Sequence, residues 1–245
     1  MIKTDRGYAQ LYKIYGKSET DVKEALKDIL KQGGAAVVYT RRRGKEVHVL
    51  AEVEEQDEET AKNLTKPVAK EIKKALGTMY YSTRENETME EAVVRLLTKY
   101  SLTVTTAESC TGGMVASKIV NVPGASEVFN EGFITYSNKS KRKILDVSKN
   151  TLKKYGAVSE ETAREMALGG VFAADTDACV AVTGIAGPDG GTEEKPVGLV
   201  YISCCLKNEV TVEECRFHGT RIEIREQAAT AALDLLRRSV LKNCR

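Results

Sequence analysis

The pattern of hydrophobic and polar positions divides the chain into short strands and amphipathic helices. In the first third, residues that alternate between apolar and polar predict strands, whereas apolar residues three or four positions apart predict helices. The elements, in chain order, are a strand at residues 10–15, a helix from residue 18 to the glycines at 33 and 34, strands at 37–39 and 47–50, a helix ending at Gly77, and a last strand at 79–82. We expect a small α+β sandwich, with each helix covering one face of the same sheet.

Beyond residue 88 the pattern changes to strands separated by helices, which predicts a largely parallel sheet. The elements are a helix from Met89, a strand at 102–106, a helix at 111–120, a strand at 129–136, a helix at 160–173, a strand at 178–183, strands at 198–206 and 210–217, and a helix at 222–241. The two strands around Lys207-Asn208-Glu209 form an antiparallel hairpin, so the sheet is mixed. We predict an α/β fold class: a three-layer α/β/α domain preceded by the small α+β domain.

The balance of charge also changes along the chain. Residues 1–84 contain 17 basic and 13 acidic side chains, and residues 85–245 contain 20 and 22. A polar stretch at 82–88 lies between the two parts. At 245 residues the chain is long enough for two cores, so we expect two domains, residues 1–84 and 85–245.

Composition restricts the class of protein. Apolar residues make up 42% of the chain and charged residues 29%, as in an ordinary globular protein. The net charge of +2 gives no electrostatic reason to expect a nucleic-acid partner. Apolar runs such as 178–182 are too short to span a membrane, and Met1 begins no secretory signal. We therefore expect a cytoplasmic protein with no membrane contact.

The cysteines and histidines argue against a metal site. Six cysteines are present, mostly within apolar strands, and they are expected to be buried free thiols. There is no Cys-x-x-Cys pair, and His48 and His218 are the only histidines. A zinc site therefore lacks ligands at a usable spacing, and we expect neither a metal nor a cofactor.

Polar residues gather directly after several predicted strands, where ligands of open α/β sheets bind. In the segment from Ala107 to Gly113 a strand turns into a helix, which would place the hydroxyl of Ser109 beside unpaired N–H groups. Such groups hold a phosphate or the oxyanion of an acyl transfer. From this segment alone, helix capping by Ser109 and Thr111 is the favoured interpretation.

A serine nucleophile needs a base, and both histidines are poorly placed for that role. The segment after the next strand contains Tyr136, Lys139, Lys141 and Lys143. A lysine serves as a base when desolvation or neighbouring cations such as Arg142 lower its pKa, and a phenol can relay the proton. The alternative is a solvated, basic helix start without chemistry.

Two further segments favour anion binding. The loop from Thr183 to Thr192 contains Gly184 and Gly187, whose backbone N–H groups could approach an anion closely, although the spacing fits neither the P-loop nor the dinucleotide fingerprint. Arg221, at the start of the last helix, could pair with a phosphate. A plain flexible loop and an ordinary exposed arginine are the alternatives.

Taken together, from about Glu87 to about Arg238, these segments resemble the CinA C-terminal family, the bacterial nicotinamide-mononucleotide deamidases. The motifs that carry the resemblance are Ala107-Glu108-Ser109-Cys110-Thr111-Gly112-Gly113, Tyr136-Ser137-Asn138 with Lys141, Gly156-Ala157-Val158-Ser159, Thr183-Gly184-Ile185-Ala186-Gly187-Pro188 and Glu194-Lys195-Pro196-Val197-Gly198. Several long motifs in one order make a chance resemblance implausible.

The resemblance implies hydrolysis of nicotinamide mononucleotide to nicotinic acid mononucleotide and ammonia, in pyridine nucleotide salvage and without a metal or cofactor. It implies that Ser109 is the nucleophile, Lys141 its base and Tyr136 an assisting group. The residues expected to bind substrate or oxyanion are Thr111, Gly112, Thr183, Gly184, Gly187 and Arg221. Lys139 and Lys143 remain alternatives for the base.

The first part of the chain resembles the small KH-like domain of full-length CinA proteins, where a molybdopterin-binding-like domain precedes it. We expect no such preceding domain in this protein, and therefore no ADP-ribose pyrophosphatase activity. Two other functions stay open: a non-catalytic module that binds a nucleotide or protein, and an amidase with another substrate or one linked to nucleic acid through Arg41-Arg42-Arg43. The arginine run is expected to form a solvated hairpin turn. We expect a homodimer, since twofold dimers are the commonest soluble oligomers.

Overall fold

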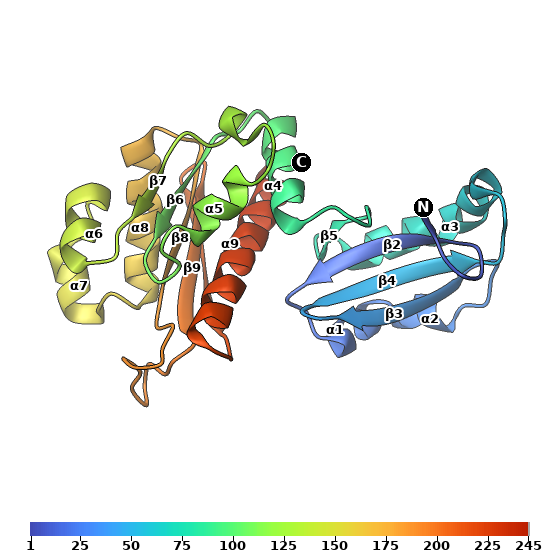
Figure 1. Ribbon diagram of the computed structural model, residues 1–245, viewed down its shortest axis with the longest axis horizontal. Helices are drawn as coiled ribbons and strands as arrows, with labels where there is room; N and C mark the ends of the chain where they lie inside the picture. Colours follow the sequence, from blue (N-terminus) through green and yellow to red (C-terminus); the bar gives the residue numbers. More distant parts are fainter. Residues whose placement is uncertain (245) are drawn as a thin grey trace. The chain divides into compact units, whose positions relative to one another are not determined.

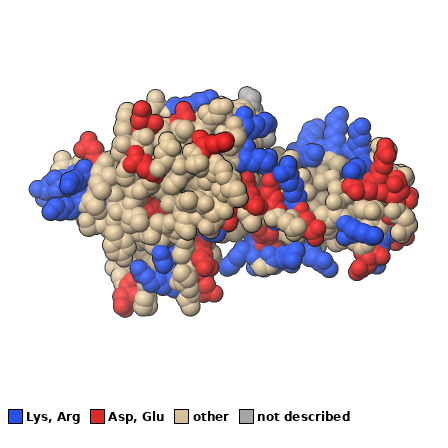
Figure 2. Space-filling view, turned by 45° about the horizontal axis from the view of Figure 1, so that its top comes forward, with Lys and Arg blue, Asp and Glu red and all other residues tan. Residues whose placement is uncertain are grey.

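The computed structural model describes residues 1–244 and divides the chain into two compact units. The first unit runs from Met1 to Thr88 and the second begins at Met89. Basic and acidic side chains both occur over the face seen in Figure 2. Among the described residues, no helix combines the length and the apolar character needed to cross a membrane.

The first unit is a five-stranded sheet packed against helices (Figure 1). Its elements are β1 (Ile2–Lys3), β2 (Tyr8–Tyr15), α1 (Glu19–Ala25), α2 (Lys27–Lys31), β3 (Val37–Arg43), β4 (Glu46–Val53), α3 (Glu58–Leu76) and β5 (Tyr80–Ser82). The strand order is β1-β2-β4-β3, with β5 paired to β2, and the pairs are antiparallel. All three helices contribute to one core, which includes Val22, Leu26 and Ile72.

Two features of this unit differ from the prediction. The first predicted helix is two short helices, because the backbone at Leu26 leaves the helical conformation (φ −105°, ψ 7°). The break keeps both Leu26 and Ile29 in the core. The arginine run forms no turn: Arg41 and Arg43 lie in β3, and the chain reverses at Gly44 and Lys45.

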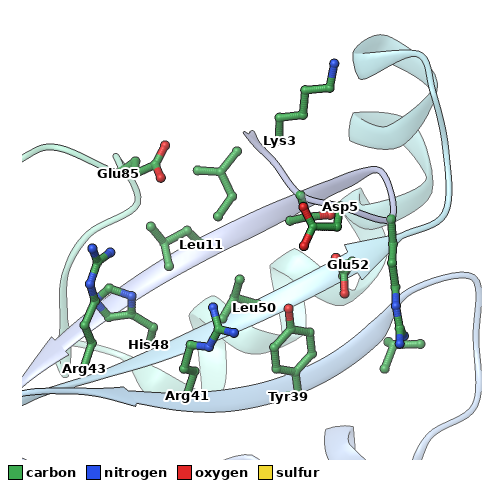
Figure 3. Close-up of a pocket in the computed structure, with 14 residues that line it drawn as sticks. Lys3, Asp5, Leu11, Tyr39, Arg41, Arg43, His48, Leu50, Glu52 and Glu85 are labelled. Carbon is green, nitrogen blue, oxygen red and sulfur yellow. The ribbon is translucent and has the colours of Figure 1, made fainter.

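The side chains of β3 alternate between the two faces of the sheet, which explains where the arginines lie. Tyr39, Arg41 and Arg43 line a hollow of about 910 Å³ together with His48 and Leu50 of β4 (Figure 3). The core residues of β4 that face the helices, by contrast, are Val47, Val49 and Ala51. The hollow therefore lies on the face of the sheet opposite the main core.

The second unit is a mixed sheet between two layers of helices, as predicted (Figure 1). Its strands are β6 (Val104–Glu108), β7 (Gly132–Ile134), β8 (Ala178–Gly184), β9 (Leu199–Leu206) and β10 (Glu209–Arg216). Its helices are α4 (Met89–Lys99), α5 (Met114–Val120), a 3₁₀ turn (Ala125–Glu127), α6 (Asn138–Leu145), α7 (Lys149–Tyr155), α8 (Glu160–Ala174) and α9 (Arg221–Asn243). The strand order is β10-β9-β8-β6-β7, with β6 parallel to both neighbours and β8, β9 and β10 antiparallel in succession.

The layers follow from the alternation of side chains along the strands. Ala107, Cys179 and Cys205 pack with Met166 of α8, and α6 and α7 in turn contact α8. On the other side, α9 contacts β8 and β9 and is itself contacted by α4 and α5. Helices α6 and α7 were not predicted, because their sequences are rich in lysine and carry few apolar residues.

Helices α6 and α8 approach each other closely at Gly169. A Cβ atom built at this position of α8 would collide with the backbone carbonyl of Leu145, the last residue of α6. The absence of a side chain at Gly169 therefore allows α6 to pack on α8. This contact matters for the site, because α6 carries Lys141.

We predict that Gly169→Ala lowers the free energy of unfolding by about 1–3 kcal/mol through this collision. Alanine is intrinsically favoured over glycine within helices by about 1 kcal/mol. A loss of stability would therefore come from the collision with Leu145 and not from helix propensity. Denaturant unfolding measures the change. The control is Gly33→Ala, where a new Cβ would meet nothing within 4 Å. Unchanged or increased stability of Gly169→Ala would contradict the prediction.

Candidate active site

Two neighbouring parallel strands, β6 and β7, end at one edge of the sheet, and the candidate site lies there. Ser109 directly follows β6, and its N–H donates to the carbonyl of Val182 at 2.9 Å. Thr135 directly follows β7, and its N–H donates to the carbonyl of Glu108 at 2.8 Å. Extension of the strand pairing beyond the strands thus fixes the backbone on both sides of the site.

Lys141 lies within reach of Ser109. Its Nζ is 2.9 Å from Ser109 Oγ and donates to the carbonyl of Thr135 at 2.7 Å. The Lys141 side chain is fully buried and Ser109 is 8% exposed. Lys139 and Lys143 are both exposed, so of the three candidate lysines Lys141 is the one that contacts the serine.

Helix α6 carries this lysine, and a capping box fixes where the helix begins. Ser137 is the N-cap residue, and its hydroxyl accepts from the backbone N–H of Ser140 while the Ser140 hydroxyl closes the capping box. The lysine follows immediately, one turn into the helix. The capping box therefore sets the position from which Lys141 reaches the serine.

Burial lowers the pKa of Lys141 from 10.5 to about 8, because the ammonium form loses its hydration. Of the two causes that the sequence left open, desolvation is the one that applies. Arg142 and Lys143 are exposed and do not contribute to the shift. At pH 7 roughly one tenth of Lys141 is therefore the neutral amine that a base requires.

The loop between β6 and α5 has backbone groups available for a ligand. Gly112 (φ 59°) and Gly113 (φ 92°) adopt left-handed conformations, and α5 has no side-chain cap, so neither Ser109 nor Thr111 caps it. The backbone N–H groups of Thr111 and Gly112 donate to no acceptor among residues 1–244. Consecutive free N–H groups beside a hydroxyl are suited to an anion. The Thr111 side chain itself is fully buried, with its hydroxyl unpaired in the described structure.

A second group of predicted residues forms the rim. Arg221, the first residue of α9, donates to the carbonyl of Gly187 at 2.6 Å and lies 3.4 Å from the hydroxyl of Tyr136. Tyr136 is 64% exposed. Gly184 ends β8, and the preceding Thr183 uses its hydroxyl to bind the carbonyl of Ala157. The structure thus brings Tyr136, Arg221 and the glycine loop together, while the Thr183 hydroxyl is already paired within the fold.

The described residues contain no group of three or more His, Cys, Asp or Glu side chains placed to hold a metal ion. Cysteines 110, 179, 204 and 205 are buried free thiols, and cysteines 215 and 244 are partly buried free thiols. Burial raises the pKa of the Cys110 thiol to about 11, so the cysteine beside Ser109 is protonated at neutral pH. The reactive side chains that this geometry joins are therefore a serine hydroxyl and a lysine amine.

Comparison with known proteins identifies the family of both units. Residues 86–240 match the CinA C-terminal domain family, and residues 9–82 match the KH domain of the damage-inducible protein CinA. The chain belongs to the CinA family. A competence-damage inducible protein of Clostridium beijerinckii is 47% identical to it over 236 residues, and a CinA-like protein of Kosmotoga olearia is 46% identical over 234 residues. Each alignment covers 96% of this chain but 57% of the relative, so the chain spans little more than half the length of these relatives.

Solved structures of CinA proteins match the second unit. The competence/damage inducible protein CihA of Agrobacterium tumefaciens is 41% identical, with a TM-score of 0.60, and covers 66% of this chain and 100% of its own. A CinA superfamily protein of Klebsiella pneumoniae is 31% identical, also with a TM-score of 0.60, and covers 63% of this chain and 98% of its own. The α/β/α architecture is thus that of the CinA C-terminal domain.

Three residues of this CinA site were missed by sequence reasoning. Glu108 places its buried carboxylate against the first turn of α5, Arg225 binds the carbonyls of Cys110 and Thr111, and Lys195 binds those of Tyr155 and Val158. A charged residue at the end of an apolar strand was a usable signal for Glu108. Arg225 lies one helical turn after Arg221, which was a weaker signal.

We predict that the amine of Lys141 titrates with a midpoint near pH 8, well below the 10.5 of a free lysine. The measurement is the pH dependence of the lysine side-chain signals in isotope-labelled protein, with Lys141 assigned by its loss in Lys141→Arg. The signals of the exposed Lys139 and Lys143 serve as internal references for the assignment. A midpoint of Lys141 near 10.5 would contradict the burial effect.

Proposed function

We propose that this chain is an amidohydrolase that converts nicotinamide mononucleotide and water to nicotinic acid mononucleotide and ammonia. The observation that carries the proposal is the 2.9 Å contact between Lys141 Nζ and Ser109 Oγ in a buried site. A hydroxyl in contact with an amine of lowered pKa is the arrangement of a serine nucleophile and its base. The substrate is inferred from membership of the CinA family, which includes nicotinamide-nucleotide amidases.

In the proposed first half-reaction, Ser109 Oγ attacks the carboxamide carbon while its proton passes to neutral Lys141 Nζ. The carbonyl oxygen becomes an oxyanion, which the N–H groups of the loop at 110–112 stabilise. Collapse of the intermediate breaks the C–N bond, and Lys141 returns the proton to the departing ammonia. The products of this step are ammonia and an ester of Ser109 with the nicotinate group.

The second half-reaction repeats the chemistry with water. Neutral Lys141 takes a proton from the water that attacks the ester carbonyl, and the same N–H groups receive the oxyanion. Collapse releases the carboxylic acid and returns the proton to Ser109. Tyr136, exposed at the rim, would assist by positioning the leaving amine or the water. None of these steps requires a metal ion.

Substrate binding is assigned to the rim. Arg221 uses part of its guanidinium on the carbonyl of Gly187, and its remaining N–H groups would pair with the phosphate. Gly184 and Gly187, with the N–H group of Gly112, would allow close approach of the ribose and phosphate oxygens. Since Thr183 already donates its hydroxyl to Ala157, its contribution would be to hold the glycine loop in place.

A non-catalytic binding module is the competing function, and the burial of Lys141 argues against it. A buried amine without a carboxylate partner reduces stability, and no ion pair to Lys141 is found among the described residues. A binding module gains nothing from that cost. An enzyme does gain from it, because burial brings the pKa of the base close to the working pH.

We predict that Ser109→Ala and Lys141→Ala each abolish ammonia release from nicotinamide mononucleotide, by about a thousandfold or more. Because both residues serve one proton transfer, the double variant should be scarcely slower than either single variant. Ammonia release measures turnover, and calorimetry should show that Ser109→Ala still binds the substrate. Near-normal turnover of Ser109→Ala, or effects of the two changes that multiply, would exclude this mechanism.

The pH profile of kcat/KM should rise with an apparent pKa of about 8, because the neutral amine of Lys141 is the active form. The lowered pKa makes the active form available above pH 8, so activity should be lost as the pH falls through that value. Lys141→Arg keeps a cation of much higher pKa and should remain inactive throughout the same range. A profile that falls between pH 7 and 9 would require a different base.

A further inference from the structure

The loop after β6 is held by a side chain to which the proposed mechanism gives no part. Arg225, half-buried on α9, donates from Nε to the carbonyl of Cys110 at 3.0 Å and from Nη2 to the carbonyl of Thr111 at 2.7 Å. The planar guanidinium thus binds two successive carbonyl groups of the loop that begins with Ser109. A fork of this kind fixes direction as well as distance.

The direction of the carbonyls determines the direction of the neighbouring N–H groups. In a trans peptide the C=O and N–H bonds of one plane point to opposite sides. Since the carbonyl of Cys110 points at Arg225, the N–H of Thr111 points away from it. By the same argument, the direction of the Thr111 carbonyl determines the direction of the N–H bond of Gly112. These are two of the N–H groups that have no acceptor among the described residues.

Glu108 fixes the next peptide from the other side. Its carboxylate is fully buried and accepts from the N–H groups of Gly113, Val115 and Ala116 at 2.9–3.1 Å. Three successive peptide planes, from Cys110 to Gly113, are therefore set by two charged side chains from different elements. Gly112 has a left-handed backbone (φ 59°), a conformation that favours glycine.

We propose that Arg225 is a positioning residue that aims the N–H groups of Thr111 and Gly112 at the oxyanion, with Glu108 fixing the following peptide. The proposal rests on the proposed function in one respect, that Ser109 is the nucleophile. It does not depend on which amide is the substrate. Arg225 acts through the loop backbone and contacts neither Ser109 Oγ nor Lys141 Nζ.

Arg221 and Arg225, both on α9, contact different parts of the site. Arg221 is exposed and reaches the glycine loop and Tyr136 at the rim. Arg225, one turn further along the same helix, has two of its three nitrogens bound to carbonyls beneath the serine loop. Arg221 is therefore suited to hold a substrate phosphate, whereas Arg225 is suited to hold the loop.

The test variant is Arg225→Lys, which keeps the positive charge but replaces the planar fork by a single point donor. Loss of one oxyanion donor commonly lowers kcat by about a hundredfold to a thousandfold, so misdirected N–H groups should lower kcat by at least about tenfold. KM should change by less than about threefold, and the pH midpoint should stay at its wild-type value, because Lys141 is untouched. The matched control is Arg164→Lys, which removes a similar donation to the carbonyl of Val210, from α8, and should behave as wild type.

A second readout separates this proposal from the choice of substrate. A fluorophosphonate probe forms a bond from Ser109 Oγ to phosphorus with loss of fluoride, the serine proton passing to Lys141, and its phosphoryl oxygen needs the same N–H groups. Wild type should be labelled at Ser109, and Arg225→Lys should be labelled at least about tenfold more slowly. If wild type is labelled but releases no ammonia from nicotinamide mononucleotide, the proposed substrate is wrong while the labelling rates still test Arg225. If neither reaction occurs, both proposals fail.

Glu108→Gln tests the same loop if Arg225→Lys does not fold, as judged by circular dichroism and thermal unfolding. The amide replaces one acceptor oxygen by an NH₂ group that faces backbone N–H donors, so the peptide at Gly113 loses its fixed direction. It should lower kcat and the labelling rate with KM and the pH midpoint little changed. Rates within twofold of wild type for folded Arg225→Lys or Glu108→Gln would overturn the proposal, as would a raised KM at unchanged kcat, which would place Arg225 on the substrate.

Discussion

The burial of the Lys141 amine against Ser109 is the constraint on which the rest of the site depends. Removing an ammonium group from water costs several kcal/mol, and here no carboxylate offsets that cost among the described residues. The lysine is held in place by a capped helix, by the carbonyl of Thr135 and by the packing of α6 on α8 at Gly169. The buried lysine thus reduces the stability of the folded protein, and the same burial lowers the pKa of its amine to a value that suits a base.

The other half of the site is the loop between β6 and α5, which is bound by charged side chains on both sides. Two consecutive glycines with left-handed backbones allow the sharp turn between β6 and α5. The N-cap residue Gly113 has no side chain, and the Glu108 carboxylate binds N–H groups of the first turn of α5 in its place. Arg225 satisfies the carbonyls on the opposite side. The loop carbonyls are thus bound by Arg225, and the N–H groups that follow the loop are bound by Glu108. The N–H groups of Thr111 and Gly112 lie between them and have no acceptor among the described residues. The availability of these groups therefore depends on charged partners on both sides of the loop.

The sequence predicted those features that depend on local pattern, and it missed those that depend on long-range contact. Regular apolar spacing predicted β8, α8 and the β9–β10 hairpin correctly, whereas lysine-rich α6 and α7 carried too few apolar residues to be recognised. Motifs pointed to Ser109 and to three candidate lysines, but only the three-dimensional packing buries Lys141 and leaves its neighbours exposed. The contact of Arg225 with Cys110 joins residues 115 positions apart, and no local spacing encodes such a pair.

The candidate catalytic residues are buried and the rim residues are exposed, and α9 contributes an arginine to each group. Ser109, Lys141 and the residues that carry the loop carbonyls are buried. Tyr136 and Arg221 are exposed, so they can meet a charged ligand without paying the full desolvation cost of a buried phosphate site. Arg221 and Arg225 lie one turn apart on α9, so one helix positions both the contact to Gly187 at the rim and the contact to Cys110 in the serine loop.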